Sequence, residues 1–231
     1  MLGRLALMMS VALGGAARAD DVTAARYAEP TDRYAHGILG DAIEFGALVM
    51  TVDGAEVLLR LPLTHVFEDT APRLIDIDGD GAREVMVVET KMTAGARISI
   101  YDGTGTLVAA TPHIGRTNRW FSPVGAADLD GDGFVEVAFI DRPHLAKVLR
   151  VWRYVDGDFA EVAVMDGVTN HRIGEPDIAG GIRDCGDRPE MIVATADWTR
   201  LLAVRMDGDL VRADIGPHTG RDSFAAAMTC G

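Results

Sequence analysis

The chain has little lysine, few aromatic residues and only two cysteines. Lys91 and Lys147 are the two lysines, aromatic residues make up 6% of the chain, and the formal net charge is −13. Such an acidic balance disfavours nucleic acid and anionic membranes as partners, since both repel negative charge. Enough apolar residues remain, at 48% of the chain, for one sizeable core.

Long apolar runs are also missing. Residues 1–19 combine a positive start, a short apolar stretch and an Ala-Arg-Ala cleavage pattern, which together predict a signal peptide removed before Asp20. No later stretch approaches 18 apolar residues, so we expect no transmembrane anchor. The predicted location of the mature chain, residues 20–231, is therefore outside the cytoplasm, either periplasmic or extracellular.

Two near-copies of an acidic loop are present, Asp76–Glu84 (DIDGDGARE) and Asp128–Glu136 (DLDGDGFVE). Each has carboxylates at positions 1, 3, 5 and 9, and a glycine at position 6 that permits a sharp turn. These hard oxygen ligands suit Ca²⁺, with the backbone carbonyl at position 7 available as well. Two calcium ions are predicted, with the ligands Asp76, Asp78, Asp80, Ala82 and Glu84 for one, and Asp128, Asp130, Asp132, Phe134 and Glu136 for the other.

Two alternatives to this metal assignment exist. An EF-hand is excluded because position 12 of the two loops is Val87 or Phe139, where an EF-hand needs a bidentate Glu. Short β-branched and apolar runs follow each loop and predict buried strands in place of helices. Metal-free Asp-Gly surface turns remain the second alternative, although clustered carboxylates repel one another unless a cation is present.

The repeat is wider than the two loops. Asp-Gly turns recur at Asp53, Asp102, Asp156 and Asp207, each between two apolar strands, and no convincing amphipathic helix interrupts them. We therefore expect an all-β fold, a small β-propeller of four blades with four antiparallel strands each. The approximate units are residues 34–62, 71–111, 122–165 and 177–215.

The first unit lacks an obvious first strand. Taking residues 36–41 as its second strand, we expect the C-terminal stretch 223–229 to complete the first blade as a closing strand. Cys185 and Cys230 then occupy equivalent loop positions and predict a disulfide that pins this strand. Two free buried thiols are the alternative.

The residues SPVGAADLDGDG with Glu136 resemble the FG-GAP or VCBS repeat family, the integrin-α-like propeller repeats of exported proteins; Asp76–Glu84 is the second match. The resemblance implies a calcium-binding blade with the acidic ligands named above. The sequence departs from the family pattern in having Glu at the ninth position, in lacking intact Phe-Gly and Gly-Ala-Pro elements, and in keeping the loop in two of four units. Larger rings are usual for the family.

Polar residues gather on the links between units, at the end opposite to the acidic loops. In a propeller these links converge on the central funnel, where ligands bind. The candidate ligand site there consists of His65, Arg119, Trp120, Asp141, Arg142, His144, His171, Arg172, Trp198 and His218. The alternative is that these side chains only bond backbone carbonyls and neighbouring acids.

The sequence thus favours an exported calcium-binding β-propeller that serves as a binding or scaffolding module, with structural calcium. Its partner could be a polar ligand, a glycan or a protein, and its oligomeric state is open. The alternative is an enzyme of hydrolase or lyase type with its site in the funnel. No nucleophile elbow, H-E-x-x-H pattern or phosphate loop identifies catalytic residues.

Overall fold

The computed structural model describes residues 20–230, so the predicted signal peptide at residues 1–19 lies outside the described residues. Nearly all regular structure is antiparallel β. The strands are β1 (Val22–Thr31), β2 (Glu44–Val52), β3 (Ala55–Arg60), β4 (His65–Phe67), β5 (Arg73–Ile75), β6 (Glu84–Lys91), β7 (Gly95–Tyr101), β8 (Leu107–Ala110), β9 (Phe121–Ala127), β10 (Glu136–Asp141), β11 (Val148–Val155), β12 (Asp158–Asp166), β13 (Val168–Thr169), β14 (Gly181–Asp184), β15 (Pro189–Thr195), β16 (Arg200–Asp207) and β17 (Asp209–Pro217), and the helix α1 (Arg221–Met228) follows them. Within this part of the chain no helix is long and apolar enough to cross a membrane.

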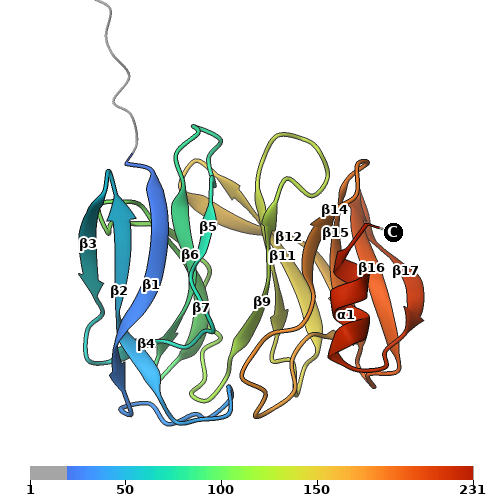
Figure 1. Ribbon diagram of the computed structural model, residues 1–231, viewed down its shortest axis with the longest axis horizontal. Helices are drawn as coiled ribbons and strands as arrows, with labels where there is room; N and C mark the ends of the chain where they lie inside the picture. Colours follow the sequence, from blue (N-terminus) through green and yellow to red (C-terminus); the bar gives the residue numbers. More distant parts are fainter. Residues whose placement is uncertain (1–19, 231) are drawn as a thin grey trace, which may run out of the picture.

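The strands form three hydrogen-bonded sheets, β1–β8, β9–β12 and β13–β17. The first is divided here into sheet 1 (β1–β3) and sheet 2 (β4–β8), and the other two are named sheet 3 (β9–β12) and sheet 4 (β13–β17). A single residue pair, Phe45 with Phe67, joins the ladders of sheets 1 and 2. Figure 1 shows the sheets side by side in chain order, with β3 and β17 at opposite ends of the row. The fold is therefore all-β and propeller-like.

The predicted strands on both sides of the Asp-Gly turns are confirmed. Strands β2 and β3 pair around Asp53, and β11 and β12 pair around Asp156. Both turn aspartates and the glycines that follow them have positive φ, the backbone that a tight hairpin turn requires at its two central residues. Local turn chemistry and β-branched flanks therefore determine these hairpins.

The predicted second strand of the first unit, residues 36–41, is wrong. This stretch is a loop, and its Gly37 and Gly40 have φ of 66° and 97°, values that an extended strand does not adopt. The strand paired to β2 is instead β1, whose register runs from Val22 opposite Val52 to Thr31 opposite Glu44. Strand β1 was missed because it is largely exposed and contains Pro30, which edge strands tolerate.

The predicted closing strand at residues 223–229 is also wrong. Its alanine-rich sequence forms most of helix α1, in keeping with the high helix propensity of alanine. Phe224 packs into an apolar cluster of sheet 4 together with Ala179, Ile192 and Leu201. The C-terminal residues therefore cover sheet 4 and do not complete sheet 1.

The predicted disulfide between Cys185 and Cys230 is confirmed, with Cα atoms 5.4 Å apart. Its place in the fold differs from the expectation. Cys185 lies in the loop between β14 and β15, so the bond fastens the end of α1 to the sheet that the helix covers. The pairing was right, but the bond lies within sheet 4 and does not join two sheets.

Apolar side chains fill the spaces between successive sheets. Phe67 and Leu48 lie in the cluster between sheets 1 and 2, and Trp120 and Phe139 in the cluster between sheets 2 and 3. All four side chains are at most 2% exposed. Burial of a side chain of this size contributes about 1.5–3 kcal/mol, so the stacked sheets stabilise one another.

The upper and lower ends of the sheets, as drawn in Figure 1, differ in chemistry. The acidic loops join β5 to β6 and β9 to β10, and both lie at the upper end in Figure 1. The links after β1, β8 and β13 lie at the lower end. As expected from the sequence, acidic loops and polar links therefore occupy opposite ends.

Candidate functional site

The acidic loop between β5 and β6 folds around its own carboxylates. Asp76 accepts a hydrogen bond from the amide of Gly79 (2.8 Å), and Glu84 reaches back to accept one from the amide of Ile77 (3.0 Å). One carboxylate oxygen from each of Asp76, Asp78 and Glu84 lies within 4.8 Å of the other two. Three hard oxygens at this spacing can serve as ligands of one Ca²⁺.

The loop between β9 and β10 repeats this geometry. Asp128 accepts a hydrogen bond from the amide of Gly131 (2.7 Å), and Glu136 accepts one from the amide of Leu129 (2.8 Å). Carboxylate oxygens of Asp128, Asp130 and Glu136 again lie within 4.8 Å of one another. In backbone terms the two loops are near-copies.

The other predicted ligands lie beside these triplets. Asp80 accepts a hydrogen bond from the amide of Ala82 (2.8 Å), and Asp132 accepts one from the amide of Phe134 (3.0 Å). Neither aspartate belongs to a triplet. The carbonyls of Ala82 and Phe134 stay predicted ligands.

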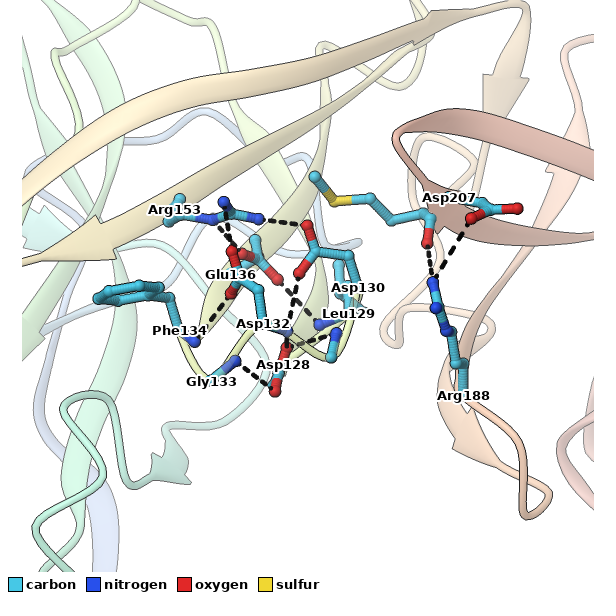
Figure 2. Close-up of polar contacts among 12 residues, drawn as sticks. Asp128, Leu129, Asp130, Asp132, Gly133, Phe134, Glu136, Arg153, Arg188 and Asp207 are labelled. Atoms are coloured by element: carbon cyan, nitrogen blue, oxygen red, sulfur yellow. Dashed lines mark hydrogen bonds and ion pairs between the residues drawn. The ribbon is translucent and has the colours of Figure 1, made fainter.

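A guanidinium group distinguishes the second loop. Arg153 of β11 lies 2.6 Å from Glu136 (Nε to Oε1), 2.5 Å from Asp130 (Nη2 to Oδ2) and 2.7 Å from Asp132 (Nη1 to Oδ2). Figure 2 shows this side chain pointing into the loop from the neighbouring strand. No ion pair of residues 20–230 includes an acid of the first loop between Asp76 and Glu84. Sequence reasoning missed Arg153 because it lies outside the motif.

The pKa values of the two buried glutamates reflect this difference. Burial raises the pKa of Glu84 to about 7; the amide of Ile77 opposes the shift, and repulsion by Asp78 adds to it. Burial also raises the pKa of Glu136, but the amide of Leu129 and the guanidinium of Arg153 both oppose that shift. The first loop therefore has uncompensated negative charge.

Sheet 4 has a third version of the loop, without the acids at positions 1 and 5. Glu190 is paired with Arg183 (2.6 Å) and with Arg205 (2.6 Å), and these two arginines lower its pKa although burial opposes them. Arg188 and Asp207, visible beside the second loop in Figure 2, lie 3.6 Å apart. In this loop arginines alone compensate the buried glutamate.

At the opposite end of the molecule lies a cavity of about 340 Å³, called here the ligand cavity. Its lining mixes cationic, imidazole and apolar side chains from four successive links and loops. They are His36, Ile38, Asn118, Arg119, Trp120, Arg142, Pro143, His144, Leu145 and Ile173. The structure brings together four of the residues that the sequence predicts for the site, Arg119, Trp120, Arg142 and His144.

His36 lines the ligand cavity and was not among the predicted site residues. Its Nδ1 is hydrogen-bonded to the carboxylate of Glu68, which is fully buried and also accepts a bond from the hydroxyl of Thr90 (2.6 Å). This arrangement fixes the imidazole and leaves Nε2 free of that contact. His36 was missed because its segment was assigned to a strand.

His144 and His171 form a second imidazole pair beside the cavity. The Nε2 of His171 donates to the carbonyl of Glu175 (2.8 Å), so its Nδ1 accepts from Nε2 of His144 (3.0 Å). Burial lowers the pKa of His144 to about 4, with His171 adding to the shift. His144 is therefore neutral at physiological pH.

The two arginines of the cavity differ in their partners. Arg142 is paired with Asp141 through Nε (2.7 Å) and Nη2 (2.9 Å). Arg119 donates to the carbonyl of Asn118 (2.6 Å), and no ion pair of residues 20–230 includes it. Although the chain has 35 acidic and 22 basic residues, Arg119 has no carboxylate partner among residues 20–230.

The remaining predicted residues lie elsewhere. Arg172 stacks 4.3 Å above the ring of Trp198, and His218 packs against the same ring, beside α1. His65 lies near Glu89 (3.9 Å), and Asp141 is buried between two arginines that bind it. The ten predicted funnel residues therefore do not form one pocket.

A comparison with curated proteins gave no match. The crystal structure of exotype rhamnogalacturonan lyase YesX is similar with a TM-score of 0.42 and 18% identity, over 72% of this chain and 40% of that chain. The chain thus spans less than half of that structure. Residues 76–139, which include both acidic loops, match the family model of the FG-GAP-like repeat.

Proposed function

We propose that residues 20–231 form one exported β-propeller-like binding module, stabilised by calcium and able to bind an anionic ligand in the ligand cavity. The observation that most favours ligand binding is Arg119, a cation without a carboxylate partner that lines a cavity. The charged residues of that lining are arginines, whereas the whole chain is acidic. An anionic group would supply the missing partner.

Calcium fits the first acidic loop by the chemistry of its donors. Asp76, Asp78 and Glu84 offer three converging carboxylate oxygens, and the carbonyl of Ala82 is a candidate for a fourth ligand. Bound calcium would neutralise carboxylates that now repel one another, and would fix the connection between β5 and β6. The role proposed for the metal is therefore structural.

Shape and polarity of the ligand cavity favour a small anionic ligand with an apolar part. Arg119 and the Nη1 of Arg142 are available for an anionic group, whereas Ile38, Leu145 and Ile173 provide an apolar wall. Cavities of a few hundred Å³ with few polar groups are typical of small-molecule sites. An acidic sugar or a carboxylate metabolite meets this description, as does an acidic chain end of a protein.

Binding can be tested with a panel of small carboxylates, phosphate esters and uronic-acid oligosaccharides, screened by thermal shift and measured by calorimetry. Arg119→Gln should weaken any hit at least tenfold, about 1.4 kcal/mol, because a charge-assisted hydrogen bond is lost. The matched control is Arg116→Gln, an exposed arginine of the same link outside the cavity lining. A hit of equal affinity in Arg119→Gln and wild type would exclude this site.

A second candidate function is an enzyme of hydrolase or lyase type. It is favoured by the contact between His36 and the fully buried Glu68, since a carboxylate that orients an imidazole is typical of general acid–base catalysis. In this proposal His36 transfers the proton through Nε2, and Arg119 holds the anionic substrate. His144, being neutral, would act as a hydrogen-bonding group.

The two candidates can be separated by turnover. Wild type and His36→Gln are compared on every ligand of the panel that binds, with product formation followed by mass spectrometry. Turnover that falls at least a hundredfold in His36→Gln, with Arg116→Gln unchanged, supports catalysis. Binding without product in the wild type leaves the binding module as the function.

Export is supported by the disulfide between Cys185 and Cys230, since disulfides persist mainly in oxidising compartments. The same compartments offer the calcium that a structural site needs. Fractionation of a producing cell, with antibody detection of the chain, tests this part of the proposal. Recovery of the full-length chain from the cytoplasm alone would contradict it.

A further inference from the structure

The two acidic loops share a sequence pattern but not a charge balance. In the second loop three of the four carboxylates are paired with the guanidinium of Arg153, at distances of 2.5 to 2.7 Å. We propose that Arg153 is the resident cation of the second loop, so that calcium binds in the first loop only. This inference rests on the calcium binding proposed above and specifies which loop provides the site.

Arg153 binds carboxylates that a metal in this loop would also need. Its Nε and Nη2 bind Glu136 and Asp130, two members of the triplet at this loop, and its Nη1 binds Asp132. Calcium at the triplet would have to displace these contacts and lie next to a positive charge. The loop is therefore preorganised around a guanidinium.

The first loop has no such group. The one arginine within it, Arg83, is directed to Asp21, to which it donates from Nε (2.8 Å) and Nη2 (2.9 Å). The carboxylates of Asp76 and Glu84 accept hydrogen bonds from backbone amides, and no arginine or lysine of residues 20–230 is paired with them. Their negative charge still requires a cation.

Strand register shows that the difference is positional. In sheet 3, Glu136 pairs directly with Arg153 across β10 and β11. In sheet 4, Met191 of β15 pairs with Val204 of β16, so the next pair of this antiparallel register is Glu190 with Arg205. In both sheets the residue opposite the ninth-position glutamate on the neighbouring strand is therefore an arginine.

Sheet 2 has an acid at the corresponding position. Val85 pairs with Tyr101, which places Asp102 opposite Glu84. Asp102 is bound within its own turn, where it accepts hydrogen bonds from Thr104 and Thr106. The three loops therefore form a series. The buried glutamate binds no arginine in the first loop and one arginine in the second, which keeps all its acids. In the third loop it binds two arginines, and two of the acids are absent.

Calcium titration decides between one site and two. The mature chain is freed of metal with a chelator and titrated with Ca²⁺ by calorimetry. We expect one site in the wild type, loss of that site in Asp78→Asn, and one unchanged site in Asp130→Asn. These two substitutions are at position 3 of the two loops, so each controls for the other.

Arg153→Gln should add a second site, with an affinity within about tenfold of the first, because all four acids of the second loop become available. Arg150→Gln is the matched control. It removes an arginine of the same strand that is paired with Asp141 and Glu161, away from the loop, and should leave one site. If Arg153→Gln fails to fold, the two aspartate variants still decide.

The outcomes separate this inference from the proposed function. Two comparable sites in the wild type, or a site lost in Asp130→Asn and kept in Asp78→Asn, would overturn the role of Arg153 but leave calcium binding intact. No binding to the wild type would overturn the proposed calcium binding itself. One wild-type site that is lost only in Asp78→Asn supports both.

Discussion

The loops Asp76–Glu84 and Asp128–Glu136 have the same acids at the same positions, yet their surroundings differ. The carboxylates of the first loop accept only backbone amides among the contacts of residues 20–230, whereas the second loop also contains the guanidinium of Arg153. One loop needs an external cation and the other has its own. A ligand pattern in a sequence therefore specifies oxygens but not the charge that balances them.

The largest expected difference between the loops is their response to calcium. Saturating calcium at a thousand times the dissociation constant should stabilise the wild type by about 4 kcal/mol, which for a chain of this size raises Tm by roughly 10 °C. Asp78→Asn should abolish the shift, and Asp130→Asn should keep it. Differential scanning calorimetry with calcium and with EDTA measures this, and an unchanged Tm in EDTA would refute the calcium assignment.

The next difference is expected without metal. Glu136→Gln removes the buried one of the three carboxylates that bind Arg153 and should cost about 2 kcal/mol in EDTA, because a charge-assisted hydrogen bond is lost. Glu84→Gln should cost less than about 1 kcal/mol, since the pKa of Glu84 is already raised to about 7 by burial and by repulsion from Asp78. Urea unfolding of both variants tests the comparison. Equal losses would mean that Arg153 does not stabilise the second loop.

Glu44 extends the comparison to a buried carboxylate without any paired cation in the described chain. Burial, with repulsion by Glu68, raises its pKa from 4.5 to about 9. Between pH 4.5 and about 9 the folded state therefore keeps a proton on Glu44 that the unfolded state releases, so stability falls as pH rises through this range. Glu44→Gln removes this pH dependence. The free energy of unfolding of the variant, relative to that of the wild type, should therefore grow by about 2 kcal/mol between pH 5 and 6.5. A constant difference across this range would contradict the shift.

The smallest effect is expected in sheet 4. Arg205→Gln leaves Glu190 with its second partner, Arg183, and the side chain of Arg205 is 50% exposed. The loss should therefore be about 1 kcal/mol or less, and smaller than the loss from Arg153→Gln in EDTA, which removes a guanidinium bound to three carboxylates. Urea unfolding of Arg205→Gln and Arg153→Gln measures both losses in free energy of unfolding. A larger loss from Arg205→Gln would show that exposure does not weaken this pair.

Much of the fold follows from local sequence. The Asp-Gly turns predicted the hairpins, and the runs after Glu84 and Glu136 predicted β6 and β10. Patterns fail where a segment owes its structure to distant contacts. Strand β1 is mostly exposed but has a partner strand in β2, and α1 has a buried anchor, Phe224, on sheet 4. Neither contact is visible in a local window.

The candidate sites divide in the same way. Acid spacing predicted two oxygen triplets, and the link residues predicted part of the ligand cavity. His36 was missed because its partner, Glu68, lies 32 residues away and the contact depends on the loop after β1. Arg172, Trp198 and His218 were grouped with the cavity by their sequence position, but packing against α1 places them apart.

By itself the sequence determined the repeating hairpins, the two sets of carboxylates and the pairing of the cysteines, because turn chemistry, ligand spacing and the count of two cysteines are local or nearly local properties. Only the tertiary structure decided where the C-terminal residues pack, which polar side chains share a cavity, and that Arg153 enters one acidic loop. Those outcomes depend on which strands lie next to each other. The residue opposite Glu136 on the next strand is Arg153, whereas the residue opposite Glu84 is Asp102.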